Sequence, residues 1–203
     1  MTTRRLRWWL FAGVALISGL GLVVELAGPE ALVSHLSLSY EGNIPTWFSS
    51  SLLLGCALAA ASIAERATRW RRHWWGMAVV LGYASMDEAA EIHEHLGGLV
   101  GTGGVLYFDW VIFAAALLAV LAILYVRFFW RGLPRATRWR LILGGAVYII
   151  GAVGMELPLG WWTERAGNAG TTYAVLDWIE ETLEMIGATL VLLALRRHRE
   201  DAA

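Results

Sequence analysis

Acidic and histidine side chains are concentrated in one short stretch of the chain, from Ser85 to His95. It holds four carboxylates and two imidazoles, those of Asp87, Glu88, Glu91, Glu94, His93 and His95. Carboxylate oxygens with a minority of imidazole nitrogens are donors that suit Fe, Mn or Zn. The stretch follows an apolar run, residues 77–84, so its charge is costly within a membrane unless it is paired, protonated or bound to a cation. It is therefore a candidate functional site.

A second group of carboxylates lies near the carboxyl terminus. Its members are Asp177, Glu180, Glu181 and Glu184. At about 100° per residue they fall within an arc of about 100° on one helix face. The same treatment of the first stretch as a helix places all its ionisable groups on one face except His93, which points the opposite way. Two such faces at similar depth would converge inside a helical bundle.

Carboxylates on facing helices, spaced i, i+3 and i+4, hold paired iron or manganese in helical bundles. The literal Glu-x-x-His of ferritin-like di-iron proteins is absent, and no arginine lies within these segments to pair the acids. We therefore predict a site for one or two divalent ions, Fe, Mn or Zn. The expected ligands are Glu88, Glu91, His93, His95, Glu181 and Glu184. Further ligands, or groups that support the ligands, are expected among Asp87, Glu94, Glu156, Asp177 and Glu180.

The rest of the chain is typical of an integral membrane protein. Of its 203 residues 58% are hydrophobic and only 16% are charged, a composition unlike that of a soluble domain. Each of six apolar segments is near the roughly 20 residues that a helix needs to cross a bilayer. The fold class is thus an all-α, six-transmembrane-helix bundle forming a single domain, with helices near residues 8–27, 47–65, 74–95, 108–130, 141–161 and 173–195.

Arginine placement predicts the orientation of this bundle. Every basic residue is an arginine, and all but Arg165 fall at the termini or around the loops after the second and fourth segments. Because basic loops stay inside, both termini are expected in the cytoplasm, with the acidic site toward the outer face of a bacterial inner membrane. The amino terminus also resembles a secretory signal, but no clear small-x-small site follows, which favours a retained helix. The first outer loop, residues 28–46, could fold over the outer mouth of the bundle.

The string Ser85-x-Asp87-Glu88-x-x-x-x-His93-Glu94, with the later run Glu180-Glu181-x-x-Glu184, resembles the signature of a group of small, uncharacterised bacterial polytopic membrane proteins. The resemblance covers these two motifs; elsewhere only hydropathy matches. It implies that His93 belongs to the motif, although the helical wheel points it away from Glu91. Two explanations stay open: the helix unwinds or bulges near Glu91, or His93 serves a neighbouring helix.

Simpler interpretations exist for individual acids. The third helix would end near Glu88 if the rest were a solvated rim. Glu156 would be an interfacial acid if Pro158 broke its helix, and Asp109 would simply cap the fourth helix.

Three classes of function are compatible with the predicted site. An enzyme would use the metal to activate oxygen or water toward a lipid or quinone-like substrate from the outer leaflet. A proton or divalent-cation transporter would use the carboxylates as a relay, although the inner half lacks the acids that a continuous path needs. A non-catalytic partner subunit would need the acids only for bundle stability. No phosphate-binding glycine motif or nucleic-acid signature is present, so neither a nucleotide nor a nucleic-acid partner is expected.

Overall fold

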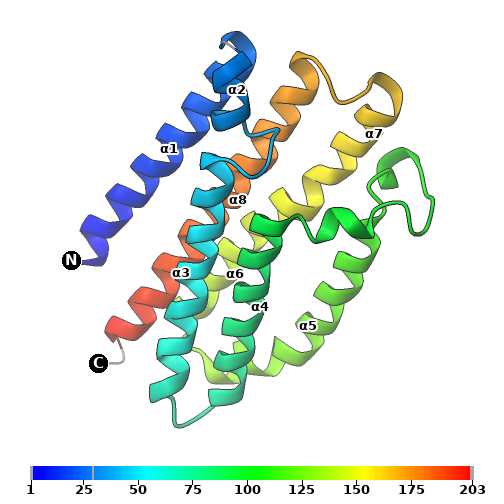
Figure 1. Ribbon diagram of the computed structural model, residues 1–203. Coiled ribbons are helices and arrows are strands. Elements are labelled where there is room, and N and C mark those ends of the chain that lie inside the picture. The colour runs from blue at the N-terminus through cyan, green and yellow to red at the C-terminus, as the bar shows by residue number, and fades with distance from the viewer. Residues whose placement is uncertain (1, 29, 202–203) are drawn as a thin grey trace.

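The computed structural model describes residues 2–28 and 30–201, and in these ranges it is built from helices, turns and bends without a strand (Figure 1). The first half contains α1 (Thr3–Ala27), α2 (Glu30–Leu36), α3 (Ile44–Arg66), α4 (Arg71–Ala90) and the 3-10 turns η1 (His93–Leu96) and η2 (Gly104–Leu106). The second half contains α5 (Trp110–Gly132), α6 (Arg135–Ile149), the π-helix η3 (Ile150–Met155), α7 (Glu156–Ala166) and α8 (Thr171–Asp201).

The all-α class is confirmed, and each of the six predicted segments is helical. Four stretches are long and apolar enough to cross a membrane: α1, α3, α5 and the continuous run from α6 through α7. α4 and α8 are not among them, because both carry acids and arginines among their apolar residues. α4 also ends at Ala90, five residues before the predicted end, and α2 is a short helix within the predicted first outer loop.

The helices form an up-and-down bundle in which α8 is central. It packs against α1, α3, α6 and η3, while α3 and α4 pack along each other as neighbours. Both termini lie at the same end of the bundle as the α3–α4 and α5–α6 turns, and α2, α7 and η1 lie at the opposite end (Figure 1). The sequence runs that carry nearly all the arginines therefore meet at one end, and the two acidic stretches lie toward the other.

Pro158 does not break its helix, as the interfacial interpretation of Glu156 required. A proline inside a helix cannot donate to the fourth residue before it, and its ring crowds that residue's carbonyl, here Gly154. The backbone relieves this by widening into the π-helix η3 immediately upstream, after which α7 continues to Ala166. π-helices are rare in proteins, and those that occur are often found at functional sites. This one presents Glu156, at the start of α7, to the bundle interior, where the residue is buried.

Glycines allow α6 to approach α8 closely. A Cβ on Gly144 would lie 2.9 Å from the backbone nitrogen of Val191, whereas a Cβ on the adjacent Gly145 would meet nothing within 4 Å. We expect Gly144→Ala to lower the free energy of unfolding by about 1–3 kcal/mol through overpacking. Gly145→Ala should be neutral or stabilise by up to about 1 kcal/mol, since alanine favours helix. Thermal unfolding in detergent, followed by circular dichroism, measures the stability of both variants. An equal change in stability in the two variants would contradict this packing.

Candidate metal centre

The acidic stretch begins on α4 and then leaves the helix abruptly. Glu91 follows the last helical residue with φ 54° and ψ 36°, the left-handed conformation that ends a helix. Its backbone N–H still donates to the Asp87 carbonyl at 2.8 Å. This conformation is uncommon for a residue with a side chain and is found disproportionately at functional sites. It turns the chain out of the helix axis, and η1 runs from the end of α4 toward α5, against which it packs (Figure 1).

Asp87 holds the chain that follows α4. Its Oδ1 accepts the backbone N–H of His93 at 2.8 Å, and its Oδ2 lies 3.1 Å from His93 Nδ1. When Nδ1 carries the proton for this bond, the other ring nitrogen, Nε2, is left deprotonated and able to bind a metal. Metal-binding histidines are commonly oriented by a carboxylate in this way.

Three side chains from two segments meet at this end of the bundle. Glu41, from the loop between α2 and α3, and His93 and Glu94, from η1, each offer one ligand atom, and these atoms all lie within 4.8 Å of one another. We call these three residues the mouth cluster. The predicted first outer loop, residues 28–46, therefore supplies a side chain to this end of the bundle, in keeping with the expectation that it folds over it.

Burial and neighbouring carboxylates shift the pKa values of Glu41 and His93 in the mouth cluster. Burial raises the pKa of the Glu41 carboxyl to about 8, with Glu91 and Glu94 adding to the effect and His93 opposing it. The carboxyl is desolvated although the residue as a whole is exposed. Burial would lower the pKa of His93, but its hydrogen bond to Asp87 and the nearby negative charges outweigh this and raise it. A bound cation would relieve the same excess of charge.

Trp110, at the start of α5, joins the mouth cluster to the bundle interior. Its indole Nε1–H donates to Glu156 Oε1 at 3.0 Å, and its ring centre lies 4.6 Å from that of His93. The indole therefore covers one side of the imidazole and positions the buried Glu156 carboxylate. Glu156 interacts electrostatically with both His93 and Glu94.

Below the mouth lies a second set of carboxylates, from α4 and α8. We call Glu88, Glu180, Glu181 and Glu184 the buried cluster; Glu180 and Glu184 are only 7% and 8% exposed, and the other two are half-buried. The charges of these side chains interact across the bundle, as the helix periodicity predicted.

The buried cluster has few polar partners. One carboxylate oxygen of Glu180 is buried and accepts no hydrogen bond from the described residues. Within the described ranges, none of the ion pairs includes a member of this cluster. Four acids that interact with one another in a region shielded from water need protons or a cation to remain stable.

Asp177, one turn above the buried cluster on α8, ties the first outer loop to the bundle. The Ser39 hydroxyl bonds to Asp177 Oδ2 at 2.7 Å and also contacts Glu25 of α1. Ser37 donates to the other oxygen of Glu25 at 2.8 Å. Because these serines precede Glu41 by a few residues, the network fixes the loop segment that delivers Glu41 to the mouth.

The two histidines of the acidic stretch, His93 and His95, lie differently from what the helical wheel indicated. The wheel placed His95 beside Glu88 and turned His93 away, but the α-helix ends at Ala90 and both histidines lie in the 3-10 turn η1. His95 is exposed, and its Nδ1 lies 2.9 Å from the Glu91 carbonyl oxygen. Of the two explanations left open for His93, unwinding of the helix near Glu91 is the one the structure adopts.

Asp109 does not cap α5 with its side chain. Its carboxylate instead accepts the backbone N–H groups of Gly98, Val100 and Gly101 at 2.7–2.9 Å. Its own desolvation would raise the pKa of Asp109, but these three donors outweigh it and lower the pKa. The residue thus organises the glycine-rich connection that follows η1.

We expect Asp109→Ala to release this connection. Three backbone donors would lose a charged acceptor, so cleavage between residues 97 and 104 by an added protease should speed up by roughly tenfold or more. Limited proteolysis with mass spectrometry of the fragments measures it. Glu164→Ala is the control, since it takes from the connection only the single bond that Gly104 donates, together with the exposed ion pair to Arg165 outside it. An equal rate in both variants would contradict the assignment.

Fold and site together define a helical bundle, apolar enough in four stretches to cross a membrane, with a carboxylate and histidine cluster at one end. The chain belongs to the family described as a domain of unknown function, DUF8692, which matches residues 8–198 and so includes every residue of both clusters. No curated protein and no solved structure matches it. The family agrees with the resemblance to an uncharacterised group and brings no assigned activity.

Proposed function

We propose that this protein crosses the bacterial inner membrane six times and binds a divalent metal ion near the outer face. Four apolar stretches support the crossing. α4 runs along α3, and its 20 residues span about 30 Å, the thickness of a bilayer core. α8 packs against α1, α3, α6 and α7, and three of its acids, Asp177, Glu180 and Glu184, are buried, so they face protein more than lipid. Arginines at the end that holds both termini support a cytoplasmic location for that end.

The observation that carries the metal is the convergence of Glu41, His93 and Glu94 within 4.8 Å. Asp87 holds the His93 ring as it would be held in a metal-binding histidine. Oxygen-rich ligation with one nitrogen favours Fe, Mn or Zn. The buried cluster below offers oxygen ligands for a second cation, which makes a dinuclear centre the natural extension of the site.

An enzyme acting on a lipid-like substrate is the function that this arrangement supports best. Three protein ligands leave coordination positions for water or substrate, as in catalytic metal sites. Glu41 and Glu94 are exposed, so the site is open at the level where a lipid or quinone headgroup would lie. The metal would supply an activated water or oxygen there.

Transport is the rival class, and the inner half of the bundle argues against it. The residues that fill this half include Ala60, Ile63, Trp74, Phe128 and Leu195, all buried and apolar. A carboxylate path from the mouth would therefore stop at the buried cluster, because no buried acid of the described residues lies further toward the inner end. A chain of carboxylates that does not reach the other side of the membrane favours a metal that stays bound over one that is transported.

Elemental mass spectrometry of the protein purified in detergent tests the proposal. One or two equivalents of Fe, Mn or Zn per chain are expected. Folded protein that holds no metal, and takes up none when each ion is supplied, would refute it. Liposomes containing the protein then separate the two classes, because metal or proton flux across them would favour a carrier over a resident site.

A further inference from the structure

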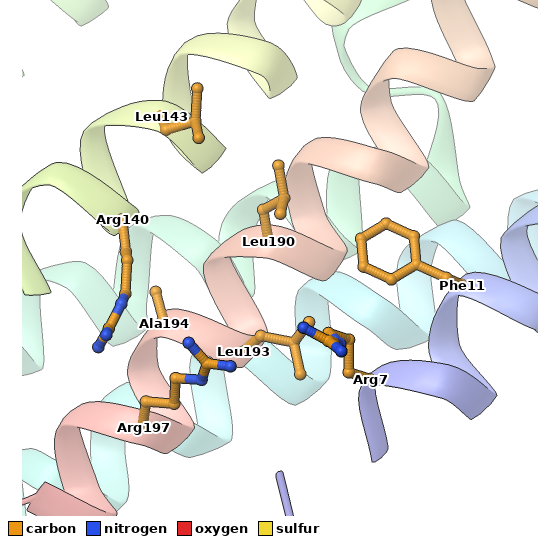
Figure 2. A pocket seen from close by; sticks show the side chains of 8 residues that line it. All are labelled: Arg7, Phe11, Arg140, Leu143, Leu190, Leu193, Ala194 and Arg197. Atoms are coloured by element: carbon orange, nitrogen blue, oxygen red, sulfur yellow. The ribbon is translucent and has the colours of Figure 1, made fainter. Parts of the chain in front are cut away.

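A groove lies at the arginine-rich end of the bundle, far along α8 from the buried cluster. It has a volume of about 180 Å³ and is formed where α1 and α6 flank α8 (Figure 2). Its floor and walls are apolar and include Phe11, Leu143, Leu190 and Leu193. Three arginines stand around one end of it: Arg7 from α1, Arg140 from α6 and Arg197 from α8.

The three arginines are only partly neutralised by the protein, since the Glu200 carboxylate interacts electrostatically with Arg197. No acidic side chain lines the groove among the described residues. Arg140 pairs with Asp201 at 3.9 Å, and that aspartate is 70% exposed. Arg7 lies over the ring of Trp8, 5.6 Å from its centre. All three arginines are half-buried, so their charges converge in a place with reduced access to water, where an anion would be held strongly.

The apolar part of the groove decides what kind of anion fits. Leu190 lies seven residues before Arg197 on α8, which places it about 10 Å deeper along the helix. Figure 2 shows Leu143, Leu190 and Phe11 on the side of the groove away from the Arg197 guanidinium. An occupant that is anionic at one end and apolar at the other matches this distribution, whereas a free phosphate ion would leave the apolar wall without a partner.

We propose that the groove between α1, α6 and α8 binds an acidic phospholipid of the cytoplasmic leaflet. The phosphate lies among Arg7, Arg140 and Arg197, and an acyl chain follows the apolar wall toward the middle of the membrane. Guanidinium groups are suited to phosphate because their planar donors bind two oxygens at once. Basic pockets between helices on the cytoplasmic side are known as sites for acidic lipid headgroups. This inference rests on the proposed membrane embedding and is independent of the metal.

Native mass spectrometry of the detergent-solubilised protein tests the site. Phosphatidylglycerol and phosphatidylcholine of equal chain length are added in turn, and we expect one phosphatidylglycerol to stay bound at concentrations where phosphatidylcholine does not. Each arginine should contribute about fivefold in affinity, so the triple variant Arg7→Gln, Arg140→Gln, Arg197→Gln should bind about 100-fold more weakly. Inorganic phosphate at millimolar concentration should not displace the lipid.

The matched control removes three arginines from the same end but outside the groove: Arg4→Gln, Arg72→Gln, Arg135→Gln. It should bind phosphatidylglycerol as the unmodified protein does. The proposal would be overturned if the unmodified protein retained the two lipids equally, a result that does not depend on any variant folding. It would also be overturned if both triple variants lost phosphatidylglycerol equally, or if phosphate displaced it. Protein that is extracted from membranes by alkaline carbonate would instead refute the embedding, and metal content reports separately on the outer site.

Discussion

Replacing His93 with alanine is expected to strip the purified protein of its metal, with affinity falling on the order of 100-fold or more. His93 is the only nitrogen ligand of the mouth cluster, and its ring is fixed by Asp87 on one side and Trp110 on the other. Asp87→Asn should have a smaller effect, about 10–100-fold, because it disturbs the orientation and basicity of the imidazole while leaving it in place. Equilibrium dialysis against buffered Zn or Mn, with elemental analysis, gives the affinities.

His95→Ala is the matched control for this series. It removes the same side chain two residues away, where the imidazole is exposed and bonds to a backbone carbonyl. Its metal content should equal that of the unmodified protein. Loss of metal in His95→Ala with retention in His93→Ala would reverse the assignment and would favour the continuous helix that the sequence indicated.

The difference between these two histidines shows where sequence reasoning reaches its limit. Helical periodicity is informative only while the helix lasts, and α4 ends because Glu91 adopts a left-handed conformation usually taken by glycine or asparagine. No glycine marks this position; the nearest is Gly97. The spacing of Asp87 and His93, which allows the carboxylate to bond to the backbone and ring of His93, was visible in the motif but does not by itself reveal that the helix ends between them.

Glu41 could not be placed from sequence for a different reason. It lies in a connection, and periodicity does not say where the tip of a loop rests. The serines at 37 and 39 were the available signal, since short hydroxyl side chains near buried acids can anchor a loop; they do so here through Glu25 and Asp177. By contrast, the convergence of Glu88 with Glu181 and Glu184 followed from helix geometry alone, because α8 is continuous from Thr171 to Asp201.

The helices themselves were predictable from hydropathy. Long apolar runs separated by short polar connections leave few alternatives to a bundle. What hydropathy could not supply was the behaviour at Pro158, because relief through a π-helix depends on the backbone of the residues before it. The result is that Glu156 is buried and bonded to Trp110 instead of lying at an interface.

Glu184→Gln is expected to change stability in opposite directions with and without metal. In metal-free protein the substitution keeps the shape of the side chain and removes one of four neighbouring negative charges, so the melting temperature should rise. In the unmodified protein, metal at about 100 times its Kd should raise the melting temperature by roughly 5–10 °C. In Glu184→Gln the part of that rise that comes from the second cation should be lost, because one of its ligands has been removed, while the ion at the mouth cluster still stabilises the variant.

Glu30→Gln provides the comparison, since it removes one exposed negative charge from α2 at the same end of the bundle. It should leave both melting temperatures nearly unchanged. The two changes in Glu184→Gln together tell whether a cation or protons neutralise the buried cluster. If protons alone do so, the metal-free variant should still be more stable than the unmodified protein. Metal would then raise the melting temperature of neither the variant nor the unmodified protein through this cluster. Metal stabilisation that survives Glu184→Gln undiminished would confine the ion to Glu41, His93 and Glu94 and would make the centre mononuclear.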